Sequence, residues 1–479
     1  MRSLFFFTLL TLCSCASLEL QYTDEAKDWT DTRLPDTLDL VHTVYLLGDA
    51  GGSKEGYVDA GIKYFGQQLD SADANSTAIF LGDNIYSHGL PTRSDPERLE
   101  AEHKINVQVD ILQNFKGHPH FIPGNHDWYS QGVIGARRQE NYVENRYDAF
   151  ENPDLPRDFD VEDLWLPNDG CSGPEVREVN DDLVIIFIDS EWYIVDWNAS
   201  PSINSGCKVR TRRGFRLAFE NAVKKYRDRN IIVALHHPPF TNGPHGGVYT
   251  WKSHLFPITA ATKSPLGYIP MPVIGSIAVF FRAATGTRSD VSFPRYRELR
   301  DLVIDVANKN GGDVMFVSGH EHNLQYFERD ENIFIVSGAG SKENVARVGR
   351  GAEFVYGSFG HANLYQYEDG SMWIEFYKVN EREDVDLKAP KTLTGEVVFR
   401  KQMKGPLKKN LEETIDELPE EYMVDSITVR ISDEPTKSKT HKALWGEHYR
   451  DAYAQEIRVP VLDMEDYRGG VVPIRRGGG

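Results

Sequence analysis

The chain has few cysteines, fewer basic than acidic residues and no long apolar run. Four cysteines occur among its 479 residues, at positions 13, 15, 171 and 207. The last two are not in Cys-x-x-Cys spacing, which argues against a zinc knuckle. Lysine and arginine number 53 against 72 acidic residues, so the net charge is −19. That charge argues against nucleic acid as a non-specific partner.

The apolar content is that of a globular protein rather than of a membrane bundle. Hydrophobic residues make up 40% of the chain, and no internal repeat is present. The length suffices for one large α/β core with an appended piece. The most apolar internal segment, 249–284, is interrupted by Pro270, Pro272 and Gly275, which argues against a transmembrane helix.

The N-terminus has the pattern of an export signal. Met1-Arg2 is a short basic start, and the apolar run Leu4–Leu12 is too short to span a bilayer. Leu12-Cys13-Ser14-Cys15 resembles a bacterial lipobox, which would make Cys15 the lipid-bearing first residue. The alternative is ordinary signal-peptidase cleavage near Ala16. We therefore expect a signal peptide over 1–14, a polar tether over 15–40, and lipid anchoring to the bacterial outer membrane on its periplasmic or surface face.

Export would leave two cysteines in the mature chain. Cys171 and Cys207 both lie in turn-rich segments. Two remaining cysteines in an exported protein favour one disulfide between them. Two unrelated buried thiols are the alternative.

Five polar motifs follow or close short apolar runs that are typical of buried strands. The runs are Thr43–Leu47, Thr77–Leu81, His120–Pro123, Asn230–Ala234 and Val314–Ser318. The motifs are Gly48-Asp49-Ala50-Gly51, Gly82-Asp83-Asn84-Ile85-Tyr86, Gly124-Asn125-His126-Asp127, Val233-Ala234-Leu235-His236 and Gly319-His320-Glu321-His322. Their oxygen and imidazole groups suit hard or borderline cations. We expect them at the carboxyl ends of neighbouring strands, where open α/β sheets place their sites.

This set of motifs resembles the calcineurin-like metallophosphoesterase superfamily, and within it the purple acid phosphatases of the tartrate-resistant type. Tyr86 completes a Gly-Asp-x-x-Tyr motif, His236 stands in Val-x-x-His, and Gly319–Tyr326 is similar to the last motif of that family with its extension. The resemblance covers roughly Thr43 to Tyr377. It implies a four-layer αββα fold, in which two mixed sheets are flanked by helices, over residues 41–384.

The resemblance also implies a ligand set for two metal ions. The first metal, ferric in purple phosphatases, would be bound by Asp49, Tyr86 and His322. Asp83 would bridge both metals. A second, divalent ion (iron, zinc or manganese) would be bound by Asn125, His236 and His320. A tyrosine that merely packs under a loop is the alternative for Tyr86.

The implied reaction is hydrolysis of a phosphate ester, with a metal-held hydroxide attacking phosphorus. His126 would donate to a phosphate oxygen or protonate the leaving group, and His245, nine residues after His236, would share the acid role. For His245 the alternative is an exposed histidine in a glycine-rich loop. Phosphomonoesters are the expected substrates. A phosphodiesterase or pyrophosphatase acting on nucleotide or lipid-linked phosphates is one alternative, and a non-catalytic binding or assembly module at the membrane is another.

Two segments lie outside the minimal phosphatase pattern. Segment 249–284 is either a local hydrophobic core or an apolar lid that rests on lipid or selects an apolar leaving group. Residues 385–479 form an extension, in which Glu396–Gln402 is typical of a strand. Its arrangement resembles that of Bacteroidota lipoprotein phosphoesterases that continue into an outer-membrane barrel, which would be the C-terminal partner.

Overall fold

The computed structural model describes residues 16–150, 159–199, 202–256, 270–388 and 391–407. These residues all belong to one compact unit. The expected lipid-bearing Cys15 and most of the expected C-terminal extension therefore lie outside the described residues.

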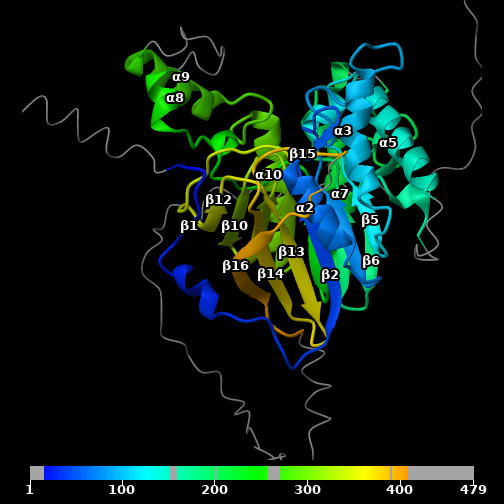
Figure 1. Ribbon diagram of the computed structural model, residues 1–479, viewed down its shortest axis with the longest axis vertical. Helices are drawn as coiled ribbons and strands as arrows, with labels where there is room; N and C mark the ends of the chain where they lie inside the picture. Colours follow the sequence, from blue (N-terminus) through cyan, green and yellow to red (C-terminus); the bar gives the residue numbers. More distant parts are fainter. Residues whose placement is uncertain (1–15, 151–158, 200–201, 257–269, 389–390, 408–479) are drawn as a thin grey trace, which may run out of the picture. The chain divides into compact units, whose positions relative to one another are not determined.

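A six-stranded mixed sheet forms one half of the core (Figure 1). Its order is β16 (Gly395–Lys404), β14 (Met372–Val379), β13 (Gly360–Tyr367), β2 (Leu40–Leu47), β4 (Ser76–Phe80) and β5 (His118–Phe121). Strands β2, β4 and β5 run parallel. Their carboxyl ends therefore lie at one edge of the sheet.

An eight-stranded mixed sheet forms the other half. Its order is β1 (Gln21–Tyr22), β12 (Ala352–Tyr356), β10 (Leu324–Arg329), β11 (Asn332–Ser337), β9 (Val314–Ser318), β8 (Asn230–Ala234), β7 (Leu183–Phe187) and β6 (Glu175–Asn180). Strands β7, β8, β9 and β11 run parallel. A third, two-stranded sheet pairs β3 (Tyr57–Val58) with β15 (Val385–Asp386).

Alternation of side chains along buried strands separates three layers of core. In β9, Met315 and Val317 face the space between the two sheets, whereas Val314 and Phe316 face the helices on the outer side. Successive residues of a strand point to opposite faces, so a strand with helices on one side and a sheet on the other is apolar throughout. This explains why the predicted strands read as continuous apolar runs.

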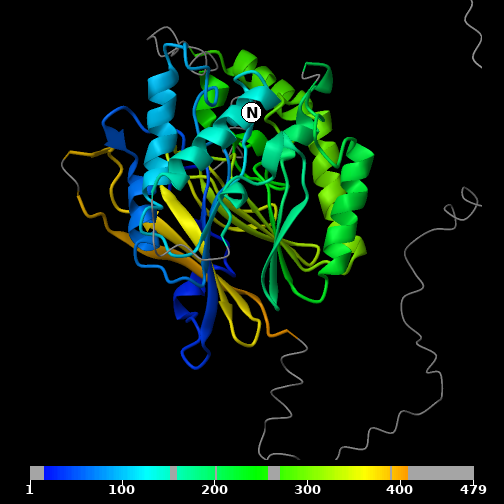
Figure 2. The same ribbon diagram turned by 90° about the vertical axis from the view of Figure 1, so that its right-hand side faces the viewer.

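Helices cover both outer faces, so the expected four-layer αββα architecture is confirmed (Figures 1 and 2). The six-stranded sheet is covered by α2 (Ala60–Leu69), α3 (Arg98–Asp110) and α5 (Val133–Asp148). The eight-stranded sheet is covered by α6 (Ser190–Ile194), α7 (Arg212–Lys225) and α10 (Pro294–Lys309). The sequence explains α7 locally: the Thr211 hydroxyl caps its first turn, and Phe215, Phe219 and Val223 form one apolar face.

The segment expected as a polar tether is packed against the two sheets instead. Strand β1 pairs with the edge of β12, and the 3-10 helix η1 (Lys27–Asp31) packs on β16. The Tyr22 hydroxyl donates to the Val398 carbonyl at 2.7 Å, and the indole of Trp29 packs against the central core. An edge strand gains hydrogen bonds and apolar cover from such a segment, which holds the chain against the body from Ser17 onward.

The expected domain boundary at residue 384 falls inside the sheet. The predicted strand Glu396–Gln402 is present as β16, which pairs with β14 along its length. Without β16 the backbone of β14 would be an open edge. The folded body therefore continues at least to Lys404.

The apolar insertion contains two helices, α8 (Trp251–Leu255) and α9 (Pro272–Thr285). Pro272 occupies the first turn of α9, where a proline needs no hydrogen-bond donor, so it starts the helix rather than breaking it. No helix in the described ranges is both long and apolar enough to cross a bilayer.

The predicted disulfide is confirmed. Cys171 and Cys207 are bonded, with Cα atoms 5.6 Å apart and 36 positions apart in sequence. The bond joins the segment after the 3-10 helix η3 (Asn168–Gly170) to the segment before α7.

Removal of this disulfide is expected to lower the free energy of unfolding by about 2–4 kcal/mol, because the cross-link restricts the unfolded chain. The variant Cys171→Ala/Cys207→Ala should show that loss in urea unfolding, while dithiothreitol should destabilise only the unmodified protein. Equal stability of the two proteins under oxidising conditions would contradict this expectation.

Candidate metal centre

The strand-end loops of both sheets converge on one buried site. Three loops follow β2, β4 and β5 of the six-stranded sheet, and two follow β8 and β9 of the eight-stranded sheet. The structure brings together all seven residues expected as metal ligands: Asp49, Asp83, Tyr86, Asn125, His236, His320 and His322. Six of them are buried, and His322 is partly exposed.

The backbone at these strand ends is strained. Asp49, Asp83 and His320 have φ values of 58°, 55° and 72°, in the left-handed region that residues with a Cβ rarely adopt. Such conformations persist where the surrounding structure imposes them and are common at functional sites. Here they turn three ligand side chains into the same space.

Glycine at the preceding position is required by close packing. A Cβ at Gly82 would lie 2.6 Å from Nδ1 of His236, and one at Gly319 would lie 2.7 Å from Oδ2 of Asp49. Both distances are too short for non-bonded atoms, so only a residue without a Cβ fits at these two positions.

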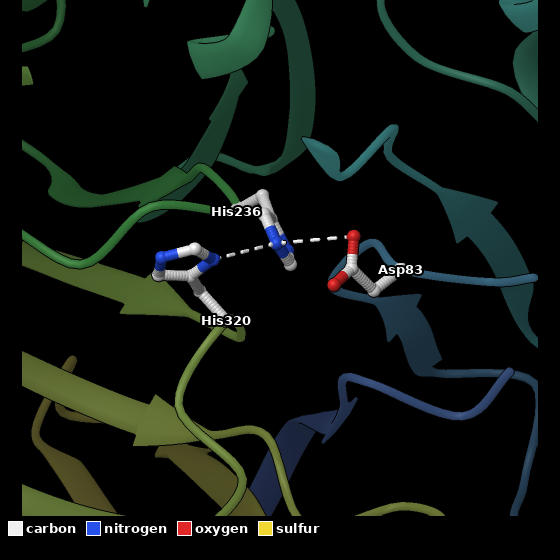
Figure 3. A group of neighbouring side chains, drawn as sticks. All are labelled: Asp83, His236 and His320. Atoms are coloured by element: carbon white, nitrogen blue, oxygen red, sulfur yellow. Dashed lines mark hydrogen bonds and ion pairs between the residues drawn. The ribbon is translucent and has the colours of Figure 1, made fainter. Parts of the chain in front are cut away.

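Four atoms that could each donate a lone pair to a metal ion lie closest together in the site. Nε2 of His236 lies 3.1 Å from Oδ1 of Asn125, 3.2 Å from Nδ1 of His320 and 3.3 Å from Oδ1 of Asp83. Nδ1 of His320 lies 3.0 Å from the same Asn125 oxygen. Figure 3 shows Asp83, His236 and His320 pointing toward one another from three loops.

Hydrogen bonds outside this cluster fix which atoms face it. Nδ1 of His236 donates to the Leu81 carbonyl at 2.8 Å, and Nε2 of His320 donates to the Ser289 carbonyl at 2.7 Å. The amide nitrogen of Asn125 donates to the Tyr129 hydroxyl at 2.7 Å. In the neutral histidines, therefore, the inward-facing atoms are all lone-pair donors with no proton between them.

This arrangement fits a bound cation. Ligand atoms about 2.0–2.2 Å from one ion lie about 3.0–3.5 Å from each other, which matches the separations of 3.0–3.3 Å in this cluster. Burial lowers the pKa of His236, but the carboxylates of Asp83 and Asp49 outweigh it and raise that pKa to about 10. The site thus favours positive charge at this point, and a metal ion would displace the proton that otherwise supplies it.

Asp49, Tyr86 and His322 form a second group next to the first. The Tyr86 hydroxyl donates to Oδ1 of Asp49 at 2.6 Å and lies 3.1 Å from Nε2 of His322. Nε2 of His322 lies 3.6 Å from the same Asp49 oxygen. Tyr86 therefore points into the site and does not pack under a loop.

Asp83 lies between the two groups. Its carboxylate contacts His236 on one side, and on the other it interacts with the Tyr86 hydroxyl, whose pKa is raised by burial and by Asp49 and Asp83. Burial raises the pKa of Asp49 to about 7, with Asp83 as a further raising charge. Two carboxylates this close and this buried require cations to remain ionised.

His126 faces the site without joining the ligand cluster. Its Nδ1 donates to the Ser87 carbonyl at 2.5 Å, which leaves Nε2 facing Oδ2 of Asp83 at 3.8 Å. Its side chain is 27% exposed, so the imidazole can reach both the centre and solvent. The position matches a group that touches substrate.

His245 lies against the ring of His320, with ring centroids 4.3 Å apart. Its Nδ1 bonds Oδ1 of Asp290 at 3.0 Å. Asp290 is buried and also accepts two bonds from Arg282 of α9 and two from Thr287. His245 is therefore held in place rather than loosely exposed.

Two polar residues next to the site form hydrogen bonds that support the surrounding structure. The Asp127 carboxylate accepts the backbone N–H groups of Gly124, Asn84 and Ile85 and so joins two of the loops. His237 is buried and bonds Ser190 through Nδ1 at 2.8 Å.

The sequence reasoning missed Lys342 and Asp290. The Lys342 ammonium lies 2.9 Å from the centre of the Tyr86 ring. Burial lowers its pKa, while Asp83 and Asp49 oppose that effect, so its charge faces the site. A signal existed: Lys342 follows β11 and the glycine-rich Gly338-Ala339-Gly340, the same strand-then-glycine pattern as the five motifs.

No protein-family model and no curated protein sequence matches this chain. Among solved structures it is similar to GAP50, the anchor in the inner membrane complex of Plasmodium, at 16% identity and a TM-score of 0.44, over 80% of this chain and 96% of that one. A purple acid phosphatase from yellow lupin (Lupinus luteus) aligns at 13% identity and 0.38, over 74% and 54%. A dimetal phosphatase from Danio rerio aligns at 10% and 0.34, over 75% and 99%. The functional assignment therefore rests on the geometry of the site.

Proposed function

We propose that this chain is a dinuclear-metal phosphohydrolase of the calcineurin-like metallophosphoesterase type, similar to the acid phosphatases of that superfamily. The observation that carries the proposal is the set of four inward-facing lone-pair donors on Asp83, Asn125, His236 and His320. The second group, Asp49, Tyr86 and His322, adjoins it through Asp83. Seven ligands divided in this way suit two ions that share one carboxylate.

When bound, two such ions lower the pKa of a coordinated water and accept charge from the phosphoryl oxygens. The residues of the chain then have separate tasks. When His126 is protonated, the Ser87 carbonyl holds the proton on Nδ1, and the proton on Nε2 is free to pass to a phosphate oxygen or to the departing alkoxide. Lys342 adds a positive charge on the Tyr86 side. His245, held by Asp290, would bind the leaving group.

We propose iron(III) at the Asp49, Tyr86 and His322 group and a divalent iron, zinc or manganese ion at the other. A phenol between a carboxylate and an imidazole is a hard anionic ligand once deprotonated, which suits a trivalent ion. Metal analysis of the purified protein should give two ions per chain, one of them iron. A visible absorption band should be present and should be lost in Tyr86→Phe, while the divalent ion remains. Colourless protein that holds two divalent ions would remove the ferric assignment and keep the phosphohydrolase.

Phosphomonoesters are the proposed substrates, and hydrolysis of an aryl phosphate by the metal-loaded protein tests this. Hydrolysis of bis-aryl phosphates or pyrophosphate with no turnover of the monoester would favour the diesterase or pyrophosphatase alternative. No turnover of any of the three by protein that holds both metals would favour the non-catalytic membrane module.

We also propose that the protein is exported and lipid-anchored to the bacterial outer membrane through Cys15. The Cys171–Cys207 disulfide supports an oxidising compartment. Mass spectrometry of the mature N-terminus tests the anchor: a lipid-modified Cys15 is expected. A mature chain that begins after residue 15 without lipid would contradict it.

A further inference from the structure

Helix α9 turns an apolar stripe away from the protein. Its exposed apolar residues are Val273, Ile274, Ile277, Phe280 and Phe281, and each is more than half exposed. Their spacing of one, three and four residues places them on one side of a helix. The stripe exposes on the order of 500 Å² of apolar surface, as much as the largest patch of a typical monomer, and such patches usually mark an interaction site.

The opposite side of α9 is fastened to the body of the protein. Gly275 is buried on that side, and the Arg282 guanidinium donates to both oxygens of Asp290 at 3.1 Å. Asp290 in turn holds His245 at the candidate metal centre. The stripe therefore has a defined orientation, on the outside of a helix whose inner side supports the site. Figure 1 shows α8 and α9 projecting beside the sheets.

The segment around the stripe has a small positive excess in a chain that is acidic overall. Within 249–256 and 270–300 there are six lysines and arginines against two acidic residues, although the whole chain has a net charge of −19. Four of the arginines are ion-paired: Arg282 with Asp290, Arg288 with Glu191, Arg295 with Glu298 and Arg300 with Asp301. With Glu191 and Asp301 included, six basic residues face four carboxylates, which leaves an excess of two positive charges. A helix with an apolar face and a basic margin is typical of binding to the surface of anionic lipids. A second copy of the chain would place the same basic segment opposite itself, which disfavours self-association through this face.

The N-terminal end of the body lies near the same loops. Ser17 and Ala346 exchange backbone hydrogen bonds at 3.1 Å, and the N–H of Arg347 donates to the carbonyl of Asn242, three residues before His245. Because Ser17 is already held there, no free tether separates residue 17 from the body. A lipid on Cys15 would keep this side of the protein at the bilayer.

From these observations we infer that the α9 stripe docks on an anionic lipid surface, and that the metal centre acts on phosphate esters carried by lipids in that surface. The stripe would enter the headgroup region while Arg282, Asp290 and His245 keep the centre beside it. The substrate class rests on the proposed phosphohydrolase function, whereas the docking of α9 does not.

Docking is tested on the full-length protein with an environment-sensitive fluorophore at Ile277→Cys. The matched control is Leu217→Cys on α7, an equally exposed apolar position on another helix. With vesicles containing phosphatidylglycerol, the label at 277 should be quenched by lipid-borne nitroxides and the label at 217 should not. Vesicles of phosphatidylcholine alone should give much weaker quenching at 277. A label at 277 that stays in water with both vesicles, or equal quenching at both positions, would overturn the inference.

The substrate class is tested with Ile274→Ser/Phe280→Ser against the control Leu217→Ser. Hydrolysis of phosphatidic acid in vesicles should fall about tenfold or more, because two apolar side chains no longer enter the lipid. Hydrolysis of a soluble aryl phosphate should stay within about twofold for both variants. Equal loss on both substrates would overturn the lipid-substrate inference. If the unmodified protein cleaves the aryl phosphate but not phosphatidic acid, the substrate inference fails alone, and if it cleaves neither, the proposed function fails.

Discussion

His236→Ala is expected to remove the divalent metal and to lower hydrolysis of an aryl phosphate by roughly 10³-fold or more, since loss of a residue that only supports a ligand already costs about 10–100-fold. The imidazole of His236 contributes the atom that faces Asp83, Asn125 and His320 together. Alanine there leaves the Asp83 carboxylate buried beside an incomplete set of ligands. Metal content measured by mass spectrometry and turnover measured with added zinc, manganese or iron check this result.

The matched control for that variant is His42→Asn. His42 is another buried histidine, but it bonds the Thr77 hydroxyl within the six-stranded sheet rather than the site. It should retain both metals and most of the activity. A His236→Ala protein that is folded, holds two metals and turns over normally would rule out the ligand assignment.

His126→Ala is expected to retain both metals and to lower turnover by roughly 10²–10⁴, the usual contribution of a positioned acid. The imidazole donates to the Ser87 carbonyl through one nitrogen and faces the centre with the other, at 3.8 Å from Asp83. The loss should be large for alkyl phosphates and small for nitrophenyl phosphate, because a good leaving group needs no proton. Rates for a series of leaving groups check this dependence.

His88→Ala is the control for His126. His88 is an exposed neighbour whose ring bonds the Ser87 hydroxyl, and its loss should change turnover by no more than about twofold. If His126→Ala lowers turnover equally for good and poor leaving groups, His126 positions the phosphate and does not supply the leaving-group proton.

The sequence alone was sufficient for the central strands and for the positions of the candidate ligands. Each of these signals is local: a short apolar run buried on both faces, a glycine that permits a tight turn, and a polar residue directly after it. Parallel strands end at a common edge, so strand-end residues as distant in sequence as Asp49 and His320 could be expected to meet before any contact was known. The hydrogen bond from the His320 N–H to Asp49, 2.7 Å long, is such a meeting.

Only the tertiary structure showed the role of the N-terminal segment, the domain boundary, the support of His245 and the orientation of α9. Each of these depends on contacts between segments that are distant in sequence. The segment expected as a tether forms strand β1, which pairs with β12 and is part of the sheet. Strand β16 pairs with β14, so the body extends past the expected boundary at residue 384. In both cases the segment supplies hydrogen bonds to an otherwise unpaired strand edge. Asp290 supports His245 across a separation of 45 residues, with no sequence pattern linking them. The apolar composition of α9 was visible in the sequence, but only the anchoring of Arg282 on Asp290 decides which side of the helix faces solvent.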